Sequence, residues 1–139
     1  MTELSLRLGY LLKHAQLDMA AWNEKALRPF DVDGRELGVL VLLADGEPSS
    51  QQEAAQQLGV DRTTMVGLLD TLEGKGLVSR HPHATDRRRN VVELTETGQD
   101  TLRRALAASD EAERELLAPL SAEAAQQFRA ALHKIVTRP

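Results

Sequence analysis

Two short helical patterns follow each other in residues 50–80, which read SQQEAAQQLGVDRTTMVGLLDTLEGKGLVSR. The first pattern starts at Ser50, a good N-cap, with Glu53 at the capping-box spacing. It ends at Gly59, because glycine readily adopts the left-handed conformation that terminates a helix. The second pattern starts at the N-cap Asp61. Two short helices joined by a glycine turn predict a helix-turn-helix unit, with helices over about 50–58 and 61–74.

A β-hairpin is predicted directly after this unit. Residues 77–80 and 90–94 are short apolar runs typical of strands, and residues 81–89 between them are polar and rich in turn formers. The tip of the hairpin carries Asp86 followed by three arginines, Arg87, Arg88 and Arg89. Arginines on such a wing suit the minor groove of DNA, where the negative potential attracts them. An adjacent carboxylate can hold one guanidinium in a fixed direction.

The two helices of the unit offer further candidate DNA contacts. The second helix of a helix-turn-helix lies in the major groove with its N-terminal residues at the base edges. There, arginine can bind a guanine edge through two hydrogen bonds, and threonine can contact bases or a thymine methyl group. A glycine one turn later lets the backbone approach DNA, and the start of the first helix can offer N–H groups to phosphate. These candidate contacts are Ser50, Gln51, Arg62, Thr63, Thr64 and Gly67.

Longer helices are predicted on both sides of this region. Apolar residues recur at helical spacing before Pro29 and again after the hairpin, and Pro119 interrupts the second series. The fold class is therefore mainly α with a small β-hairpin wing. The predicted helices outside the helix-turn-helix unit span residues 4–28, 34–44, 96–117 and a final segment that begins at Ser121.

Composition favours helices and self-association. The chain has 139 residues, enough for a single domain, with 23 Leu and 18 Ala against 9 Val and 1 Ile. Aromatic residues are only 3%, so a helical dimer with a shared core is expected. The absence of cysteine excludes disulfides and thiol chemistry. With neither a signal peptide nor an apolar run of membrane-spanning length, we expect a cytoplasmic protein with no membrane partner.

Charge is distributed unevenly along the chain. The formal net charge is −4, yet residues 60–90 hold six basic and four acidic side chains. An acidic chain with one basic strip suggests contact with phosphate in one place, although a solvated basic turn would give the same pattern.

Four segments of the sequence resemble the MarR (multiple-antibiotic-resistance regulator) family. They are Leu58–Val66, Leu72–Arg80, Thr85–Arg89 and Leu94–Gly98. The resemblance implies a winged helix-turn-helix homodimer of bacterial or archaeal cytoplasm that represses transcription from a palindromic operator. It also implies release of DNA when a small, often phenolic or anionic, effector binds between the dimer region and the DNA-binding lobe.

The resemblance further implies roles for parts of this chain. The Asp-x-Arg pattern of the family's wing falls on Asp86 and Arg88, so that Arg88 would enter the minor groove, with Arg87 and Arg89 on phosphate. Residues 1–139 would form a single winged helix-turn-helix domain. Its DNA-binding lobe would cover about 34–98, and its dimerisation helices would cover about 4–28 and 100–136.

Three residues are candidates for effector binding. Trp22 falls on the apolar stripe of the first helix, so it is a core or dimer-interface residue or a wall of the effector pocket. His14 is a half-exposed helix histidine or an effector ligand. Arg35, like Arg28, is a surface charge or the partner of an anionic effector.

No pattern in the sequence indicates an enzyme. The chain lacks a catalytic Ser-His-Asp context, a glycine-rich phosphate loop and an HExxH motif. His81 and His83 form a His-x-His pair, but a metal would need further ligands, so turn residues near DNA are the favoured interpretation. We therefore expect no cofactor and no metal. The expected partners are double-stranded DNA, a second copy of the chain and a small organic or anionic effector. The alternative is a protein-interaction module on a winged-helix scaffold, although such a module would not need the wing arginines.

Overall fold

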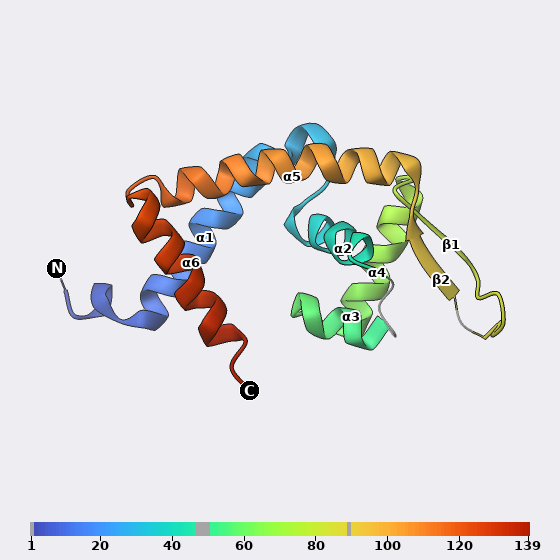
Figure 1. Cartoon of the computed structure of the whole chain (residues 1–139), viewed down its shortest axis with the longest axis horizontal. Helices are drawn as coiled ribbons and strands as arrows, with labels where there is room; N and C mark the ends of the chain where they lie inside the picture. The colour runs from blue at the N-terminus through green and yellow to red at the C-terminus, as the bar shows by residue number, and fades with distance from the viewer. Residues whose placement is uncertain (1, 47–50, 89) are drawn as a thin grey trace.

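The structure is a computed structural model that describes residues 2–46, 51–88 and 90–139. It is mainly helical with one two-stranded antiparallel sheet, which confirms the predicted fold class (Figure 1). Its elements in chain order are η1 (Leu4–Leu6), α1 (Leu8–Leu27), η2 (Arg28–Phe30), α2 (Gly34–Ala44), α3 (Gln51–Leu58), α4 (Arg62–Gly74), β1 (Val78–Pro82), β2 (Asn90–Leu94), α5 (Glu96–Leu117) and α6 (Ala122–Val136).

The long helix α5 links two groups of elements. Figure 1 shows α1 and α6 under one end of α5, and α2, α3, α4 and the hairpin under the other end. Helix α1 packs along α5, and α2 packs against both α5 and α4. This arrangement separates a pair of terminal helices from a compact lobe that contains the helix-turn-helix unit and the wing.

The buried core lies mostly in this compact lobe. Leucines and valines of α2 and α4 meet the base of the hairpin and the first half of α5 there. Removing such side chains from water stabilises the fold by about 2 kcal/mol each. The largest fully buried side chains are Leu27, Val39, Leu40, Met65, Leu69 and Leu72.

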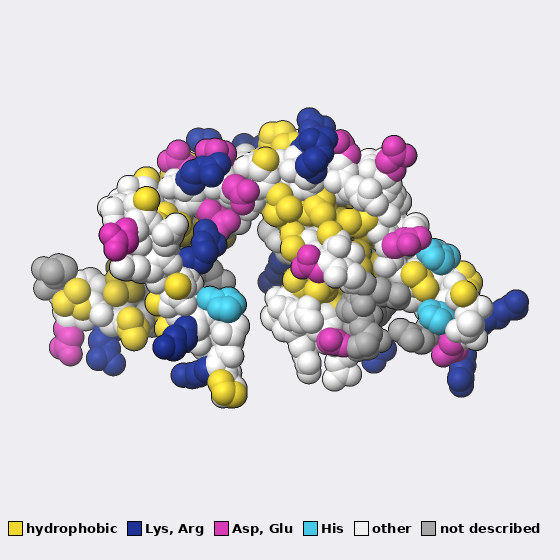
Figure 2. All heavy atoms as spheres, in the orientation of Figure 1, with side chains coloured by type: hydrophobic (Ala, Val, Ile, Leu, Met, Phe, Trp, Pro, Cys, Tyr) yellow, Lys and Arg dark blue, Asp and Glu magenta, His cyan; other side chains and the backbone are white. Residues whose placement is uncertain are grey.

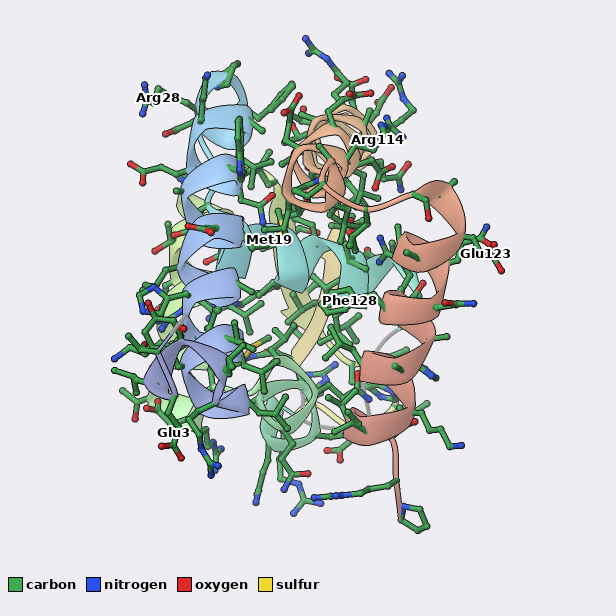
Figure 3. The ribbon with its side chains drawn as sticks, turned by 90° about the vertical axis from the view of Figure 1, so that its left-hand side faces the viewer. Glu3, Met19, Arg28, Arg114, Glu123 and Phe128 are labelled. Carbon is green, nitrogen blue, oxygen red and sulfur yellow. The ribbon has the colours of Figure 1, made fainter. Side chains whose placement is uncertain are left out.

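The terminal helices carry a large apolar surface that a single chain does not bury. Among the described residues, α6 contributes none to the buried set and α1 contributes only Leu27. Leu8, which we expected on the packed stripe of the first helix, is 75% exposed, and apolar side chains gather on this end of the molecule (Figure 2). A groove of about 550 Å³ runs between α1, α5 and α6, and Met19 and Phe128 lie between the two terminal helices (Figure 3). Exposed apolar surface of this extent marks a protein interface.

Helix ends agree with the predictions except near the N-terminus. The predicted helix over 4–28 is divided, because Arg7 is extended (φ −72°, ψ 136°) and separates η1 from α1. Pro29 ends α1 as expected, and the chain continues as the short 3₁₀ turn η2. A capping box on α2 was not foreseen: the Asp33 carboxylate accepts from the Glu36 amide at 2.8 Å, and Glu36 Oε1 accepts from the Asp33 amide at 3.2 Å. The predicted Ser50–Glu53 box involves Ser50, which lies outside the described residues.

Candidate nucleic-acid interface

Helices α3 and α4 form the predicted helix-turn-helix. The turn between them is closed by two backbone hydrogen bonds, Gly59 N to Gln56 O at 3.1 Å and Val60 N to Ala55 O at 3.0 Å. Gly59 has φ +68°, a conformation that side chains with a Cβ rarely adopt. This turn directs Ala55 of α3 into the core together with Met65 of α4, and leaves the polar faces of both helices outside.

The start of α4 presents the residues predicted to contact bases. Asp61 caps the helix, since its Oδ1 accepts from the Thr64 amide at 2.6 Å. This hydrogen bond lowers the pKa of Asp61 below its ordinary value, and the positive charge of Arg35 acts in the same direction. Arg62 and Thr63 are exposed, whereas Thr64 is half-buried. The exposed N-terminal turn of α4 is therefore free to meet another molecule.

Gly67 lies on the same exposed face of α4. No atom lies within 4 Å of the position where a Cβ would stand. Packing within the chain therefore does not require glycine here, unlike at Gly98. The missing side chain leaves the helix backbone open to the outside, as expected for a close approach to DNA.

The base of the wing is locked to the start of α5. The Thr95 hydroxyl donates to Gly76 O at 2.6 Å, and the Thr95 amide donates to Leu77 O at 3.1 Å. The same hydroxyl accepts from the Gly98 amide at 2.9 Å. A Cβ on Gly98 would stand 1.9 Å from Leu77 O, so only glycine fits. These contacts explain why threonine and glycine occur in the Leu-Thr-x-x-Gly segment, because together they fix the direction of the hairpin relative to α5.

A salt bridge joins the wing to α4. Arg80 on β1 lies 2.7 Å from the Asp70 carboxylate on the exposed face of α4. The Arg80 side chain is mostly buried, and its Nε has no hydrogen-bond partner among the residues that the structure describes. Arg80 is one of the six basic residues of 60–90, and its pairing with Asp70 holds α4 and the wing at a fixed relative position.

Asp86 and Arg88 contact each other at the wing tip. Asp86 Oδ1 accepts from the Arg88 amide at 3.1 Å, and Arg88 Nε lies 3.5 Å from the same oxygen. The Arg88 side chain is 94% exposed, and Arg87 is exposed as well. Asp86 therefore fixes the backbone of Arg88 while the guanidinium stays available. Arg89, the third predicted arginine, lies outside the described residues.

These surfaces lie on one side of the lobe. Figure 1 shows α3 and the tip of the hairpin on the side away from α5, and Figure 2 shows Lys and Arg side chains at the end of the wing. Three of the predicted contacts cannot be placed, because Ser50, the Gln51 side chain and Arg89 are outside the described part. The structure brings Arg62, Thr63, Gly67, Asp86, Arg87 and Arg88 to the surface of the helix-turn-helix and wing and leaves Thr64 half-buried, and all seven stay predictions as DNA contacts.

A cavity of about 1000 Å³ lies between α1 and the start of α2. Of the three predicted effector residues, only Arg35 lines it, together with two other cationic side chains, Arg28 and Lys75. Its walls come from α1, from the segment after η2, from the start of α2 and from the end of α4. The lining residues are Gln16, Met19, Ala20, Asn23, Glu24, Arg28, Asp31, Val32, Asp33, Gly34, Arg35, Glu36 and Lys75.

The other two predicted effector residues lie elsewhere on α1. Trp22 is 36% exposed and has Lys25 Nζ 5.7 Å from its ring centroid. His14 packs on Tyr10, with the ring centroids 4.2 Å apart. Neither is among the residues that line the cavity, and both stay predictions.

The two wing histidines take separate hydrogen-bonding roles. His81 Nε2 lies 3.5 Å from Glu93 across the hairpin, and His83 accepts from backbone amides of the tip. Among the residues that the structure describes, no group of three His, Asp or Glu side chains could hold a metal ion. Within the same described part, no helix is long and apolar enough to cross a membrane.

A family model and a known relative match parts of this chain. The MarR family model matches residues 30–89, which include α2, the helix-turn-helix and the first strand and tip of the wing. The HTH-type transcriptional repressor NicR of Pseudomonas putida is 34% identical over 97 residues, which make up 69% of this chain and 61% of NicR. The chain thus aligns with about three-fifths of that relative's length.

Two solved structures of the transcriptional repressor CouR resemble the whole chain. One, bound to a 23-mer DNA duplex, is 34% identical with a TM-score of 0.89, and the alignment covers 98% of this chain and 96% of CouR. The other, from Rhodococcus jostii RHA1 and bound to p-coumaroyl-CoA, is 31% identical with a TM-score of 0.85, and covers 100% and 98%. The resemblance that the four sequence segments indicated is confirmed, and the chain belongs to the MarR family.

Proposed function

We propose that the protein is a homodimeric transcriptional repressor that binds a palindromic operator through α4 and the wing. The observation that carries the proposal is the wing tip, where Asp86 holds the backbone of Arg88 at 3.1 Å and leaves its guanidinium exposed. The repressor CouR, which has the same fold, has been solved with DNA. In this chain, Arg88 enters the minor groove while Arg62 and Thr63 meet base edges in the major groove.

The dimer forms through the terminal helices. Their apolar side chains, such as Leu8 and Phe128, are exposed in the single chain, and the groove between α1, α5 and α6 is open. A second copy covers this surface and supplies the core that the chain lacks. A two-fold dimer carries two recognition helices, so the operator half-sites lie about 34–36 Å apart, one turn of the duplex.

A small anionic effector releases the repressor from DNA. The cavity between α1 and α2 lies between the dimer region and the DNA-binding lobe, and Arg28, Arg35 and Lys75 give it positive side chains. CouR has been solved with p-coumaroyl-CoA, an aromatic and anionic compound. We therefore propose aryl carboxylates or their coenzyme A thioesters as the class of effector.

The function is tested by selecting genomic DNA fragments with the purified protein and sequencing them. We expect enrichment of one short palindrome, and loss of that enrichment with the Arg88→Ala protein at unchanged dimer content. Recovery that depends on salt but not on sequence would contradict an operator-specific repressor. Absence of recovery at low salt would favour the alternative, an interaction module without specific DNA binding.

The effector class is tested on the selected operator. Salicylate and p-coumaroyl-CoA are added to the complex, and release is followed by fluorescence anisotropy. Release by either compound, together with loss of that compound's binding in the Arg35→Ala variant, would support the cavity as the effector site. Release that is unaffected by Arg35→Ala would place the effector elsewhere.

A further inference from the structure

His83 sits at the centre of the hydrogen bonds that shape the wing tip. Its Nδ1 accepts from the Asp86 amide at 3.1 Å and from the Thr85 amide at 3.2 Å. The Thr85 hydroxyl lies 3.2 Å from the same nitrogen. His83 is half-buried, in contrast to the exposed arginines that follow it. One ring nitrogen therefore closes the turn that leads into the Asp-x-Arg segment.

The geometry sets the protonation state of the ring. A backbone N–H can only donate, so Nδ1 must carry a lone pair and the single ring proton must be on Nε2. The Thr85 hydroxyl then donates to Nδ1 as well. A doubly protonated imidazolium has donors on both nitrogens and cannot accept these bonds. The observed tip is therefore compatible only with the neutral ring.

The bonds of His83 reach Arg88 through Asp86. His83 Nδ1 holds the Asp86 amide, and the Asp86 carboxylate in turn accepts from the Arg88 amide at 3.1 Å. We propose that His83 is a positioning residue for DNA binding, whose neutral ring orders the wing tip and whose protonation disorders the tip and weakens operator binding. The proposal rests on the proposed function, because it concerns the same wing.

The charged groups near His83 belong to the wing. In Figure 1 the tip projects away from the helices, and the charged groups of the described part of the wing include Asp86, Arg87 and Arg88 in the tip, and His81 with Glu93 on the strands. The Asp86 carboxylate is held by Arg88, with Arg88 Nε at 3.5 Å. Protonation of His83 Nδ1 removes the acceptor of the Asp86 amide, and Asp86 carries the carboxylate that holds Arg88.

The chain permits a matched set of variants. Asparagine places an oxygen acceptor close to the position of Nδ1 and does not titrate, so His83→Asn keeps the hydrogen bonds without the pH response. His83→Ala removes the acceptor. His81→Asn removes the other wing histidine, which lies 3.5 Å from Glu93, whereas the Thr85 and Asp86 amides donate to His83. Both positions are in the wing, away from the buried core.

The test is operator affinity at pH 7.5 and pH 5.5 at constant ionic strength, a range in which a free imidazole gains its second proton. On acidification we expect wild type and His81→Asn to lose roughly three- to tenfold more operator affinity than His83→Asn loses. At pH 7.5 we expect His83→Ala to bind the operator more weakly than wild type by about the same factor. Tighter wild-type binding at pH 5.5 than that of His83→Asn would overturn the proposal, because His83 would then act as a phosphate-binding cation. Equal affinity of His83→Ala and wild type at pH 7.5 would also overturn it.

A measurement on the free protein separates this proposal from the proposed function. The ¹⁵N chemical shifts of the His83 ring report which nitrogen is protonated, and the amide signals of Thr85 and Asp86 report the turn. We expect an unprotonated Nδ1 at pH 7.5 and amide shifts that follow the ring titration. A proton on Nδ1 at pH 7.5, or amides that ignore the titration, would overturn the role of His83 even if a specific operator is found. If the tip behaves as expected but no operator exists, it is the proposed function that fails.

Discussion

Lys75 and Glu36 form an ion pair with 2.7 Å between Nζ and Oε2, which joins the end of α4 to the start of α2. The same ammonium donates to the carbonyl oxygen of Asp31 at 2.5 Å. Asp31 has φ +53°, a left-handed conformation that is unfavourable for a residue with a Cβ, and this bond helps to hold it. Lys75 thus links the end of α4 to Asp31 and Glu36, which line the same cavity.

We predict that Lys75→Met destabilises the protein substantially. The Glu36 carboxyl is only 8% exposed, so the substitution leaves a buried carboxylate without its cation. The expected loss in the free energy of unfolding is about 2–3 kcal/mol. Urea unfolding at fixed protein concentration measures it, since a dimer's stability depends on concentration.

The control is Arg103→Met, which breaks the exposed pair between Arg103 and Asp100 at 2.6 Å. Because solvent screens this surface pair, we expect a loss below about 1 kcal/mol. Equal losses for the two variants would contradict a special role for the Lys75–Glu36 pair.

Gly98→Ala is expected to disturb the join between the wing and α5. Its Cβ would meet the carbonyl oxygen of Leu77 at 1.9 Å, so the backbone would have to move, at a cost of about 2–3 kcal/mol. The matched control is Gly67→Ala, where the Cβ meets nothing. There, alanine in a helix should stabilise the fold by about 0.5–1 kcal/mol. Thermal unfolding of the two variants checks the contrast, and a stable Gly98→Ala protein would show that the close contact can relax.

Features that depend on neighbouring residues could be predicted from the sequence, whereas contacts between distant parts of the chain could not. The bounds of α2 and α5 agree with the predicted 34–44 and 96–117, because local capping groups and interrupting residues set them. Pairs such as Arg80 with Asp70 and Lys75 with Glu36 could not be foreseen. They depend on how whole elements pack, which no local pattern records.

The apolar stripe of the first helix illustrates a second limit. The spacing correctly indicated a helix, but Leu8 and Leu11 are exposed in the single chain. Apolar periodicity indicates that one face of a helix is buried, but it does not show whether the same chain or a second copy covers that face. The wing tip was partly predictable. The Asp-x-Arg pattern indicated that Asp86 and Arg88 act together, whereas the hydrogen bonds of His83 depend on the conformation of the loop, which no sequence pattern shows.

The cap of the recognition helix should give a pH-dependent contribution to stability. The pKa of Asp61 is lower in the folded protein than its ordinary value, chiefly because the carboxylate accepts from the Thr64 amide. Its ionised form therefore stabilises the fold above the ordinary pKa, and this contribution disappears as the pH falls through the lowered pKa. We expect Asp61→Ala to lower Tm at neutral pH and to approach wild type near pH 3. Asp61→Asn keeps a capping oxygen and should lose less; a pH-independent deficit of Asp61→Ala would contradict the assignment.

Arg88→Ala should weaken operator binding about tenfold or more while leaving the dimer intact. The side chain is almost fully exposed and makes no contact with the core, so its loss affects only what the wing touches. Anisotropy titrations measure the affinity, and analytical ultracentrifugation measures the dimer. Arg103→Ala, an exposed arginine on α5 away from the wing, serves as the charge-matched control. Unchanged operator affinity in Arg88→Ala would remove the wing from the DNA interface.

Arg62→Ala separates base recognition from phosphate contact. Arg62 is exposed at the first turn of α4, beside the Asp61 cap that orients this turn. If its guanidinium binds a guanine edge, the loss should be about 1–3 kcal/mol and should disappear when that one base pair is changed. The measurement is a set of single-base-pair operator variants titrated with wild type and Arg62→Ala. A uniform loss for every operator variant, with a shallower dependence on salt, would instead mean that Arg62 contacts phosphate, because a phosphate contact neutralises charge without distinguishing bases.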